Sequence, residues 1–270
     1  MNKHDLVINL DVFITELRLM EKSDRTLTKY KTNCQKLIDF IQHDNEITKE
    51  DIIEFKKLIL NKDYKPSTIN SIIISVNKYI KYLGAKDLKV LKIKTQQKSS
   101  LEAVISMNDY NRLLRFAKRL GYEDVYLIMK VITTTGIRIS ELQFFTVESI
   151  ADSYYIHIRN KGKDRDIIMT KELSRELKRY CRDHKIKTGK IFTLNESTIW
   201  RRMKRIAGAA RVNKDYVHAH SFRHLFAKEF MSKYNNVLEL ADILGHKKLE
   251  TTKIYTMTTK EEKRKKLETM

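Results

Sequence analysis

Apolar residues recur every three or four positions along most of the chain, which is the spacing of amphipathic helices. One Pro and seven Gly are the few strong interruptions. In residues 1–85 this pattern predicts four helical regions, which can bury their apolar sides by packing together as a bundle. The regions run from about Asp5 to Leu19, from Ser23 or Asp24 to Ile41, from Thr48 onward, and from Pro66 to Gly84.

Polar residues suited to cap a helix stand at the start of three of these regions. Thr48 is followed by Asp51 at the spacing of a capping box, and Pro66 favours the first helical position of the fourth region. Each predicted cap has a side-chain oxygen that can accept a hydrogen bond from the first turn. The candidates are Ser23 or Asp24, Thr48, and Ser67 or Thr68.

Residues 86–100 lose the helical period and carry many lysines with few acidic residues. Such a run is typical of an extended linker. The sequence therefore predicts a helical domain at 1–85, a linker at 86–100 and a second domain at 101–270.

The second domain is predicted to be mostly helical with one β-hairpin. Ser106 caps its first helix, and an apolar helix that follows ends at Gly136. Two apolar or alternating runs, 154–158 and 166–169, flank a polar turn and indicate antiparallel strands. Further helices are expected at about 171–183, 196–209, 219–233, 237–244 and 258–268. The expected fold class is mainly α, with a small antiparallel β-sheet in the second domain.

The composition adds a partner to this picture. A formal net charge of +20 exceeds what solubility requires and favours a polyanion, with nucleic acid as the leading candidate and a solvated lysine-rich surface as the alternative. The sequence has no apolar run of about 18 residues and no apolar signal segment, so we expect a cytoplasmic protein without membrane contact. Cys34 and Cys181 lack CxxC spacing and are expected to be small core residues.

The stretch TTTGIRISEL places Arg138 in a run that otherwise indicates a buried helix. A guanidinium that faces a core needs an anion. On a helix that starts near Ile137, Arg138 and Glu141 share a face, so one interpretation is a local ion pair between them. The other is an external anion.

Two later stretches carry further candidate groups. HAHSFRHLFAKEF places His220 and Arg223 on one side of a helix, and LADILGHKKLETTKIYT supplies His246 and Tyr255. Taken singly, each match is weak, because a lone Tyr is usually a packing residue. His220 and His224 also have the spacing of zinc ligands, but no Glu follows His220 as in HExxH and no third ligand is evident.

In combination, these residues stand in the order found in the tyrosine recombinase (phage integrase) family, and the chain resembles its two-domain, Xer-like members. The pieces that carry the resemblance are TGIRISEL, NKGK in the hairpin, HSFRH, LGH and TTKIYT. The first domain is similar to the helical, SAM-like core-binding domain of that family. The resemblance implies a catalytic set of Arg138, Lys161, His220, Arg223, His246 and Tyr255.

The resemblance also implies a role for each of these groups. Tyr255 would be the nucleophile that forms a 3′-phosphotyrosine, and two arginines would clamp the scissile phosphate, since a guanidinium matches two phosphate oxygens. His220 would accept the phenolic proton, and Lys161 would protonate the leaving 5′ oxygen, with Lys163 as its close rival. His246 would contact the phosphate, and Glu141 would hold the arginine network. So many cations would make Mg²⁺ or another cofactor unnecessary.

Double-stranded DNA is the partner that follows from the resemblance. A basic helix offers further phosphate contacts, although a merely solvated face is an equal alternative. The resemblance implies a homotetramer on paired sites, a monomer or dimer off DNA, and a tail at 258–268 that packs on a neighbour or else frays. The residues of the basic helix are Arg201, Arg202, Lys204 and Arg205.

Site-specific recombination is thus the expected activity. A type IB topoisomerase uses similar chemistry, but the compact two-domain layout favours recombination. A DNA-binding regulator without activity is disfavoured because every catalytic position of the family is filled.

Overall fold

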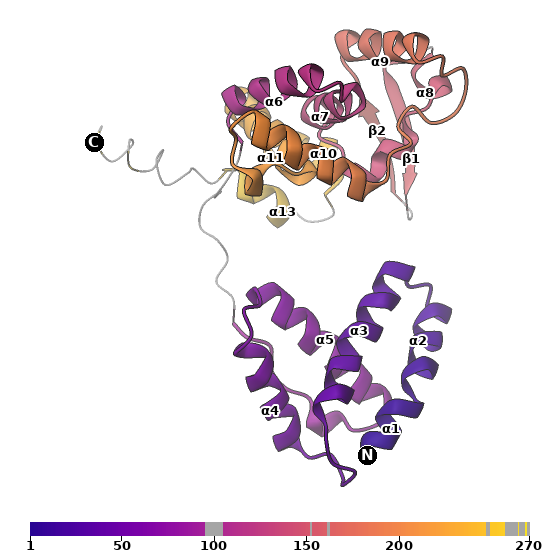
Figure 1. The fold of residues 1–270 in the computed structure, drawn as a ribbon, viewed down its shortest axis with the longest axis vertical. Coiled ribbons are helices and arrows are strands. Elements are labelled where there is room, and N and C mark those ends of the chain that lie inside the picture. Colours follow the sequence, from indigo (N-terminus) through magenta and orange to yellow (C-terminus); the bar gives the residue numbers. More distant parts are fainter. Residues whose placement is uncertain are drawn as a thin grey trace. The chain divides into compact units, whose positions relative to one another are not determined.

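The computed structural model describes residues 1–94, 105–151, 153–160, 163–246 and 249–256, together with Arg264 and Glu268. The chain divides into two compact units, Met1–Gln97 and Lys98–Met270 (Figure 1). The division falls inside the stretch 86–100 that was predicted as a linker. Each unit has a hydrophobic core of its own.

The N-terminal unit is a bundle of helices around a core of Leu, Ile and aromatic side chains. The first predicted helical region is in fact two helices, because the chain breaks at Asn9, whose side-chain amide donates to the Asp5 carbonyl at 2.9 Å. The elements are α1 (Lys3–Ile8), α2 (Leu10–Leu19), α3 (Asp24–Phe40), α4 (Lys49–Leu60), α5 (Pro66–Tyr82) and the short 3₁₀ helix η1 (Lys86–Leu88).

Two of the three predicted N-caps of this unit stand where the sequence placed them. Thr48 and Asp51 form the predicted reciprocal capping box at the start of α4. Ser23 precedes α3, although its hydroxyl bonds to Thr26 rather than to the backbone. The prediction for Ser67 or Thr68 was wrong, because Pro66 begins α5 and Lys65 takes the cap position. The fixed φ of proline suits the first helical residue, so the helix starts earlier than the hydroxyls.

The first part of the predicted extended linker packs against the N-terminal unit. The side-chain amide of Asn77 pairs with the backbone of Val90, accepting at 3.0 Å and donating at 2.7 Å. Asn70 pairs in the same way with Ile93, at 2.9 and 3.1 Å. These amides imitate a strand partner, so residues 86–94 extend the bundle. Residues 95–100 lie outside the described residues.

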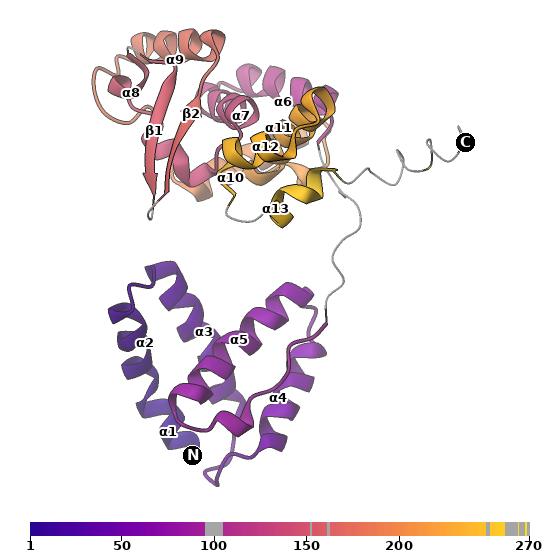
Figure 2. The same ribbon diagram turned by 180° about the vertical axis from the view of Figure 1, so that it is seen from behind.

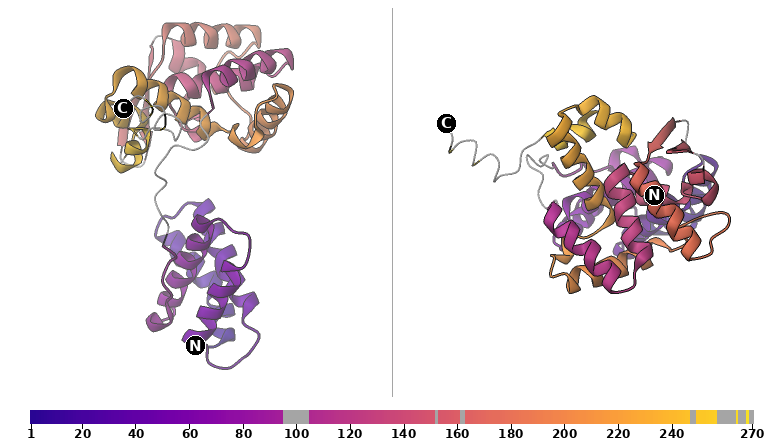
Figure 3. Two further views of the ribbon diagram at one scale, coloured as in Figure 1. Left: turned by 90° about the vertical axis from the view of Figure 1, so that its left-hand side faces the viewer. Right: turned by 90° about the horizontal axis from the view of Figure 1, so that it is seen from above.

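The C-terminal unit surrounds a buried central helix, α7 (Glu123–Thr135), which packs against α6, α9, α10 and α11 (Figure 3). The predicted helices at 171–183, 196–209, 219–233 and 237–244 are confirmed within one residue. The other elements are α6 (Met107–Arg119), η2 (Ile139–Phe144), α8 (Val147–Ala151), α9 (Lys171–Asp183), α10 (Glu196–Ala209), η3 (Lys214–Tyr216), α11 (Ala219–Tyr234), α12 (Val237–Leu244), α13 (Leu249–Lys253) and η4 (Ile254–Thr256).

The predicted hairpin is an antiparallel pair of strands, β1 (Tyr155–Asn160) and β2 (Lys163–Ile168), with α8 beside β1 (Figure 2). Tyr155 pairs with Ile168, and the register continues to Asn160 and Lys163, so the strands are longer than predicted. Alternate apolar residues face the core, as expected for a sheet with one covered face. The helix predicted at 258–268 lies outside the described residues except for Arg264 and Glu268.

Both cysteines are buried core residues, as the sequence predicted. Burial raises the pKa of the Cys34 thiol to about 12 and also raises the pKa of Cys181. Among the described helices, none is both long enough and apolar enough to cross a membrane.

Candidate active site

Gly136 ends α7 and turns the chain toward the first candidate arginine. Its φ of +67° lies in the left-handed region that favours glycine. A Cβ at this position would lie 2.5 Å from Cδ1 of Phe226 and 2.8 Å from Cδ2 of Leu244, far inside van der Waals contact. Only glycine therefore fits, and its carbonyl stays free to accept a hydrogen bond from another element.

Arg138 differs from the prediction in its local structure. The sequence predicted a helix from about Ile137, whereas Arg138 has an extended backbone and caps the 3₁₀ helix η2. The Glu141 carboxylate accepts from the Arg138 backbone N–H at 2.8 Å and from its guanidinium at 3.2 Å. The local ion pair is therefore present. It does not enclose the guanidinium, because the Arg138 side chain is 45% exposed.

Arg138 and Glu141 belong to a cluster of charged side chains that also includes Arg165 on β2. Arg165 was not identified as a member from the sequence. Its guanidinium donates to Glu141 Oε2 at 2.6 Å and also to the Ile243 carbonyl. The same side chain lies against Gly245, where a Cβ would come within 2.8 Å of its Cδ. Its place in a charged hairpin strand is the signal that could have drawn attention to it.

Glu141 is buried between these two arginines. Burial by itself would raise the pKa of the Glu141 carboxyl, but the backbone N–H of Arg138 and the charges of Arg165 and Arg138 outweigh it, so that the pKa is lowered. The carboxylate is therefore ionised and fixes both guanidinium groups.

Arg223 on α11 is almost fully enclosed, with 2% of its surface exposed. Its guanidinium donates to the carbonyls of Gly136 at 2.6 Å and Leu244 at 2.8 Å, and it lies 3.0 Å from His246 Nε2. Burial lowers the pKa of Arg223 to about 10, and the charge of Arg138 acts in the same direction. The two predicted arginines thus lie close enough to repel one another.

His246 follows α12 and links this arginine to α13. Arginine can only donate, so Nε2 of His246 accepts from Arg223, while Nδ1 carries the proton and donates to the Thr252 hydroxyl at 2.7 Å. Burial and the neighbouring arginine charges lower the pKa of His246 to about 4. The ring is therefore neutral at neutral pH.

Tyr255 in η4 is buried, with 6% of its surface exposed, although the sequence placed it in a polar stretch. Burial raises the pKa of its phenol to about 12, while the charges of Arg223 and Arg138 act to lower it. The phenol therefore lies within the field of both guanidinium groups. It belongs to a small buried core cluster together with Ala227, Met231, Leu240 and Leu244.

Three histidines lie on the first turns of α11. His218 caps the helix by accepting from the Ser221 backbone N–H, and the His220 ring is exposed. The His224 ring meets His220 edge-on at 4.1 Å between centroids and lies 5.3 Å from the Tyr255 ring. Among the described residues, no gathering of His, Cys, Asp and Glu has the form of a metal site.

Charge is unbalanced in this cluster. Within the part of the chain that the structure describes, three guanidinium groups meet one carboxylate, Glu141, and the His224 and His246 rings are neutral at neutral pH because their pKa values are lowered to about 4. Such a concentration of buried and half-buried positive charge attracts an anion.

Comparison with known proteins identifies the family. Residues 103–262 match the phage integrase family, and this region covers more than half of the chain. The chain belongs to the phage integrase family. The resemblance drawn from the motifs is therefore confirmed.

Relatives and solved structures agree with this membership. The tyrosine recombinase XerA of Saccharolobus solfataricus is 27% identical over 263 residues, which cover 91% of this chain and 87% of the relative. A XerH site-specific recombinase, in a pre-cleavage complex with its difH substrate, is 18% identical, covers 92% of this chain and 81% of that chain, and has a TM-score of 0.72. A lambda integrase tetramer bound to a Holliday junction is 15% identical, covers 94% of this chain and 77% of that chain, and has a TM-score of 0.73. The predicted fold class is thereby confirmed.

One member of the expected phage integrase set cannot be placed. Lys161 lies outside the described residues, as does its neighbour Gly162, and its role stays a prediction. The described parts of β1 and β2 flank this position. Arg165 ties β2 to Glu141, so the hairpin is anchored to the arginine cluster on its second strand.

The basic helix α10 has contacts within the unit at each of its four predicted DNA-contacting residues. Arg202 pairs with Asp124 and lies over the Tyr122 ring, and Lys204 donates to the Lys214 carbonyl. Arg201 and Arg205 are exposed, although Arg201 donates to the Thr198 hydroxyl at 3.3 Å and Arg205 lies 6.0 Å from the centre of the Tyr122 ring. The exposed pair is better placed for contact with a phosphate backbone than Arg202 and Lys204, which are half-buried.

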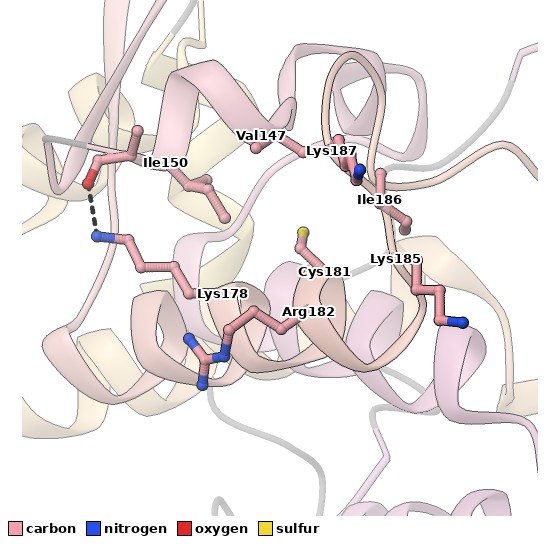
Figure 4. Close-up of a pocket in the computed structure, with 9 residues that line it drawn as sticks. Val147, Ile150, Lys178, Cys181, Arg182, Lys185, Ile186 and Lys187 are labelled. Atoms are coloured by element: carbon pink, nitrogen blue, oxygen red, sulfur yellow. Dashed lines mark hydrogen bonds between the residues drawn. The ribbon is translucent and has the colours of Figure 1, made fainter.

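A separate pocket of about 500 Å³ lies between α8, α9 and the segment after α9 (Figure 4). Its lining includes the apolar side chains of Ile150 and Cys181 as well as the basic residues Lys178, Arg182 and Lys185. None of its lining residues belongs to the arginine and histidine cluster. The pocket is therefore not part of the candidate active site of this phage integrase family member.

Proposed function

We propose that the protein is a site-specific DNA recombinase that cleaves and rejoins DNA strands through a 3′-phosphotyrosine intermediate. The observation that carries this proposal is the buried Tyr255 phenol in the field of Arg138 and Arg223, two guanidinium groups with too few carboxylates to neutralise them. The scissile phosphate supplies the missing anion. Family membership supports the same chemistry.

Each arginine has a separate part in this proposal. Arg138, whose side chain is half exposed, binds the phosphate that enters from solvent. Arg223 adds a buried positive charge, and its guanidinium is oriented by the carbonyls of Gly136 and Leu244. Paired N–H donors suit the two non-bridging oxygens and stabilise the charge that develops on them. Glu141 and Arg165 keep Arg138 in place.

Strand cleavage then follows from attack by the Tyr255 oxygen on phosphorus. The new O–P bond forms as the bond to the 5′ oxygen breaks, and religation reverses the step without ATP because one phosphodiester replaces another. His220 accepts the phenolic proton and Lys161 protonates the leaving oxygen. His246 donates to the phosphate once its Nε2 leaves Arg223 and carries the ring proton, with Nδ1 then accepting from the Thr252 hydroxyl.

Duplex DNA is the proposed partner, with phosphate contacts from α10 and a homotetramer on paired sites. The support is the net charge of +20 and the lambda integrase tetramer, which was solved on a Holliday junction. The cations of the site neutralise the phosphate without a cofactor. A cytoplasmic location follows from such a substrate and is part of the same proposal.

The test is a covalent capture in EDTA. The protein is incubated with a pool of nicked duplexes of random sequence, and DNA that stays bound in denaturant is sequenced. A nick near the target lets the 5′-hydroxyl fragment diffuse away and traps the adduct. Wild type should enrich one sequence, and Tyr255→Phe should capture none.

The matched control is Tyr154→Phe, an exposed tyrosine outside the cluster, which should capture DNA like wild type. An adduct that persists in Tyr255→Phe contradicts the nucleophile assignment. Capture without sequence enrichment, together with relaxation of any supercoiled plasmid, would favour a topoisomerase instead.

A further inference from the structure

His224 holds a buried polar atom that the activity described so far does not use. Its Nδ1 is shielded from solvent and, among the described residues, has no hydrogen-bond partner. Folded proteins seldom leave such an atom unpaired, because the lost hydrogen bond to water is not replaced. Among the described residues, this nitrogen therefore has a hydrogen-bonding capacity that is not used.

The ring next to His224 belongs to the proposed nucleophile. The His224 and Tyr255 ring centroids are 5.3 Å apart. The His224 ring also contacts the His220 ring, with 4.1 Å between their centroids. No ring contact joins His220 directly to Tyr255 within the described residues. The phenol of Tyr255 likewise makes no hydrogen bond there. An imidazole nitrogen without a partner and a phenolic donor without a partner thus belong to neighbouring rings among the described residues.

The surroundings keep the His224 ring neutral. Burial, followed by the charges of nearby groups, lowers the pKa of His224 to about 4, and those groups include no carboxylate. A neutral imidazole has one nitrogen that donates and one that accepts. The groups that act on the ring are His218, His220 and Arg223 on α11 and His246 after α12.

We propose that His224 is a positioning residue for Tyr255, with Nδ1 accepting the phenolic hydrogen bond as the tyrosine turns toward the scissile phosphate. This inference rests on the proposed function. The hydrogen bond directs the attacking oxygen and leaves final proton acceptance to His220. It also explains why α11 carries a second imidazole one turn beyond His220.

Two variants separate positioning from packing. His224→Asn keeps an acceptor oxygen close to the place of Nδ1 but loses most of the ring, whereas His224→Phe keeps the ring and loses the nitrogen. The probe is the nicked duplex that wild type captures from the random pool. Single-turnover cleavage should fall by about tenfold or more in the Phe variant, and the Asn variant should recover most of the rate.

The matched control is His184→Phe, because His184 also stacks on a tyrosine, Tyr180, at 4.0 Å but lies outside the cluster. It should cleave like wild type. His224→Leu is a second variant without nitrogen, and thermal unfolding of each protein checks that it is folded.

Three outcomes overturn the inference. Equal rates for wild type and the Phe variant exclude a role for the nitrogen, and a slower Asn than Phe variant means that His224 only fills space. Absence of any adduct in wild type removes the proposed function and this inference with it. Normal wild-type capture with unchanged variants removes the inference alone.

Discussion

The two units of the molecule bury polar groups for different reasons. In the N-terminal unit the buried polar side chains among the described residues are Asn33 and Ser75, which bond to each other at 3.0 Å. The C-terminal unit buries Glu141 and Arg223, both charged. A neutral, self-satisfied pair is compatible with a core that only holds a fold. A buried charge is costly and is weak evidence for stability.

This contrast shows where function has shaped the core. The carbonyls of Gly136 and Leu244 have no role in helix hydrogen bonding at these ends, and they are aimed at Arg223 instead. The C-terminal unit therefore holds a cation ready for an anion. The N-terminal unit has no comparable arrangement among its described residues.

Truncation of the buried arginine should give the largest effect. Arg223→Ala leaves a cavity and two buried carbonyls without donors, and should destabilise the C-terminal unit by about 3–5 kcal/mol. Urea unfolding followed by fluorescence reports on this unit alone, because the single tryptophan, Trp200, lies on α10. The counterpart, Asn33→Ala, should cost the N-terminal unit only about 1–2 kcal/mol. Equal losses would remove the contrast between the units.

Glycine substitutions test the same contrast through the backbone. Gly136 and Gly84 both have positive φ, +67° and +84°, but only Gly136 is crowded, and nothing lies within 4 Å of a Cβ at Gly84. Gly84→Ala should therefore cost about 1 kcal/mol, from the left-handed backbone alone. Gly136→Ala adds a clash with Phe226 and Leu244 and should cost about 2–4 kcal/mol.

The stability of each unit is measured in urea. Trp200 fluorescence reports the unfolding of the C-terminal unit in the Gly136 variant, and hydrogen exchange of α5 reports the unfolding of the N-terminal unit in the Gly84 variant. A Gly136→Ala protein as stable as Gly84→Ala would mean that Phe226 moves aside freely, and the site would then be less rigid than the contacts indicate.

The sequence predicted the long helices well, because apolar spacing and caps such as that of Thr48 with Asp51 are local signals. It also predicted that Arg138 and Glu141 interact. It missed Arg165, since the partners of this residue, Glu141 and Ile243, are 24 and 78 positions away in the chain. It likewise placed Tyr255 in a polar stretch, because burial of that ring depends on α11 and α12. Long-range contacts of this kind leave no periodic pattern.

Acid should weaken the C-terminal unit through its neutral histidines. The pKa of His224 and that of His246 are both lowered to about 4 in the folded protein, against about 6.5 when unfolded. The unfolded chain therefore binds more protons between these pH values, so stability is lost as pH falls from about 6.5 to about 4. Each histidine contributes less than about 1.4 kcal/mol per pH unit, because both rings are partly solvated.

Urea midpoints from Trp200 fluorescence at pH 7 and pH 5 measure this effect. The double variant His224→Asn/His246→Asn should lose less stability over the interval than wild type. Identical losses would assign the acid sensitivity to other groups. Glu141 affects stability at a lower pH than the histidines do. Its pKa is depressed in the folded protein, so its stabilising effect disappears only as the pH falls through that folded value.

The smallest effects come from two buried tyrosines, one in each unit. The Tyr79 hydroxyl donates to the Leu6 carbonyl at 2.5 Å, so Tyr79→Phe should destabilise the N-terminal unit by about 1 kcal/mol. Tyr255 makes no hydrogen bond among the described residues, so Tyr255→Phe should leave the C-terminal unit unchanged within about 0.5 kcal/mol. Hydrogen exchange of α5 and Trp200 fluorescence measure the two. A costly Tyr255→Phe would mean that its hydroxyl serves the fold, whereas a neutral one leaves that hydroxyl free to act on DNA.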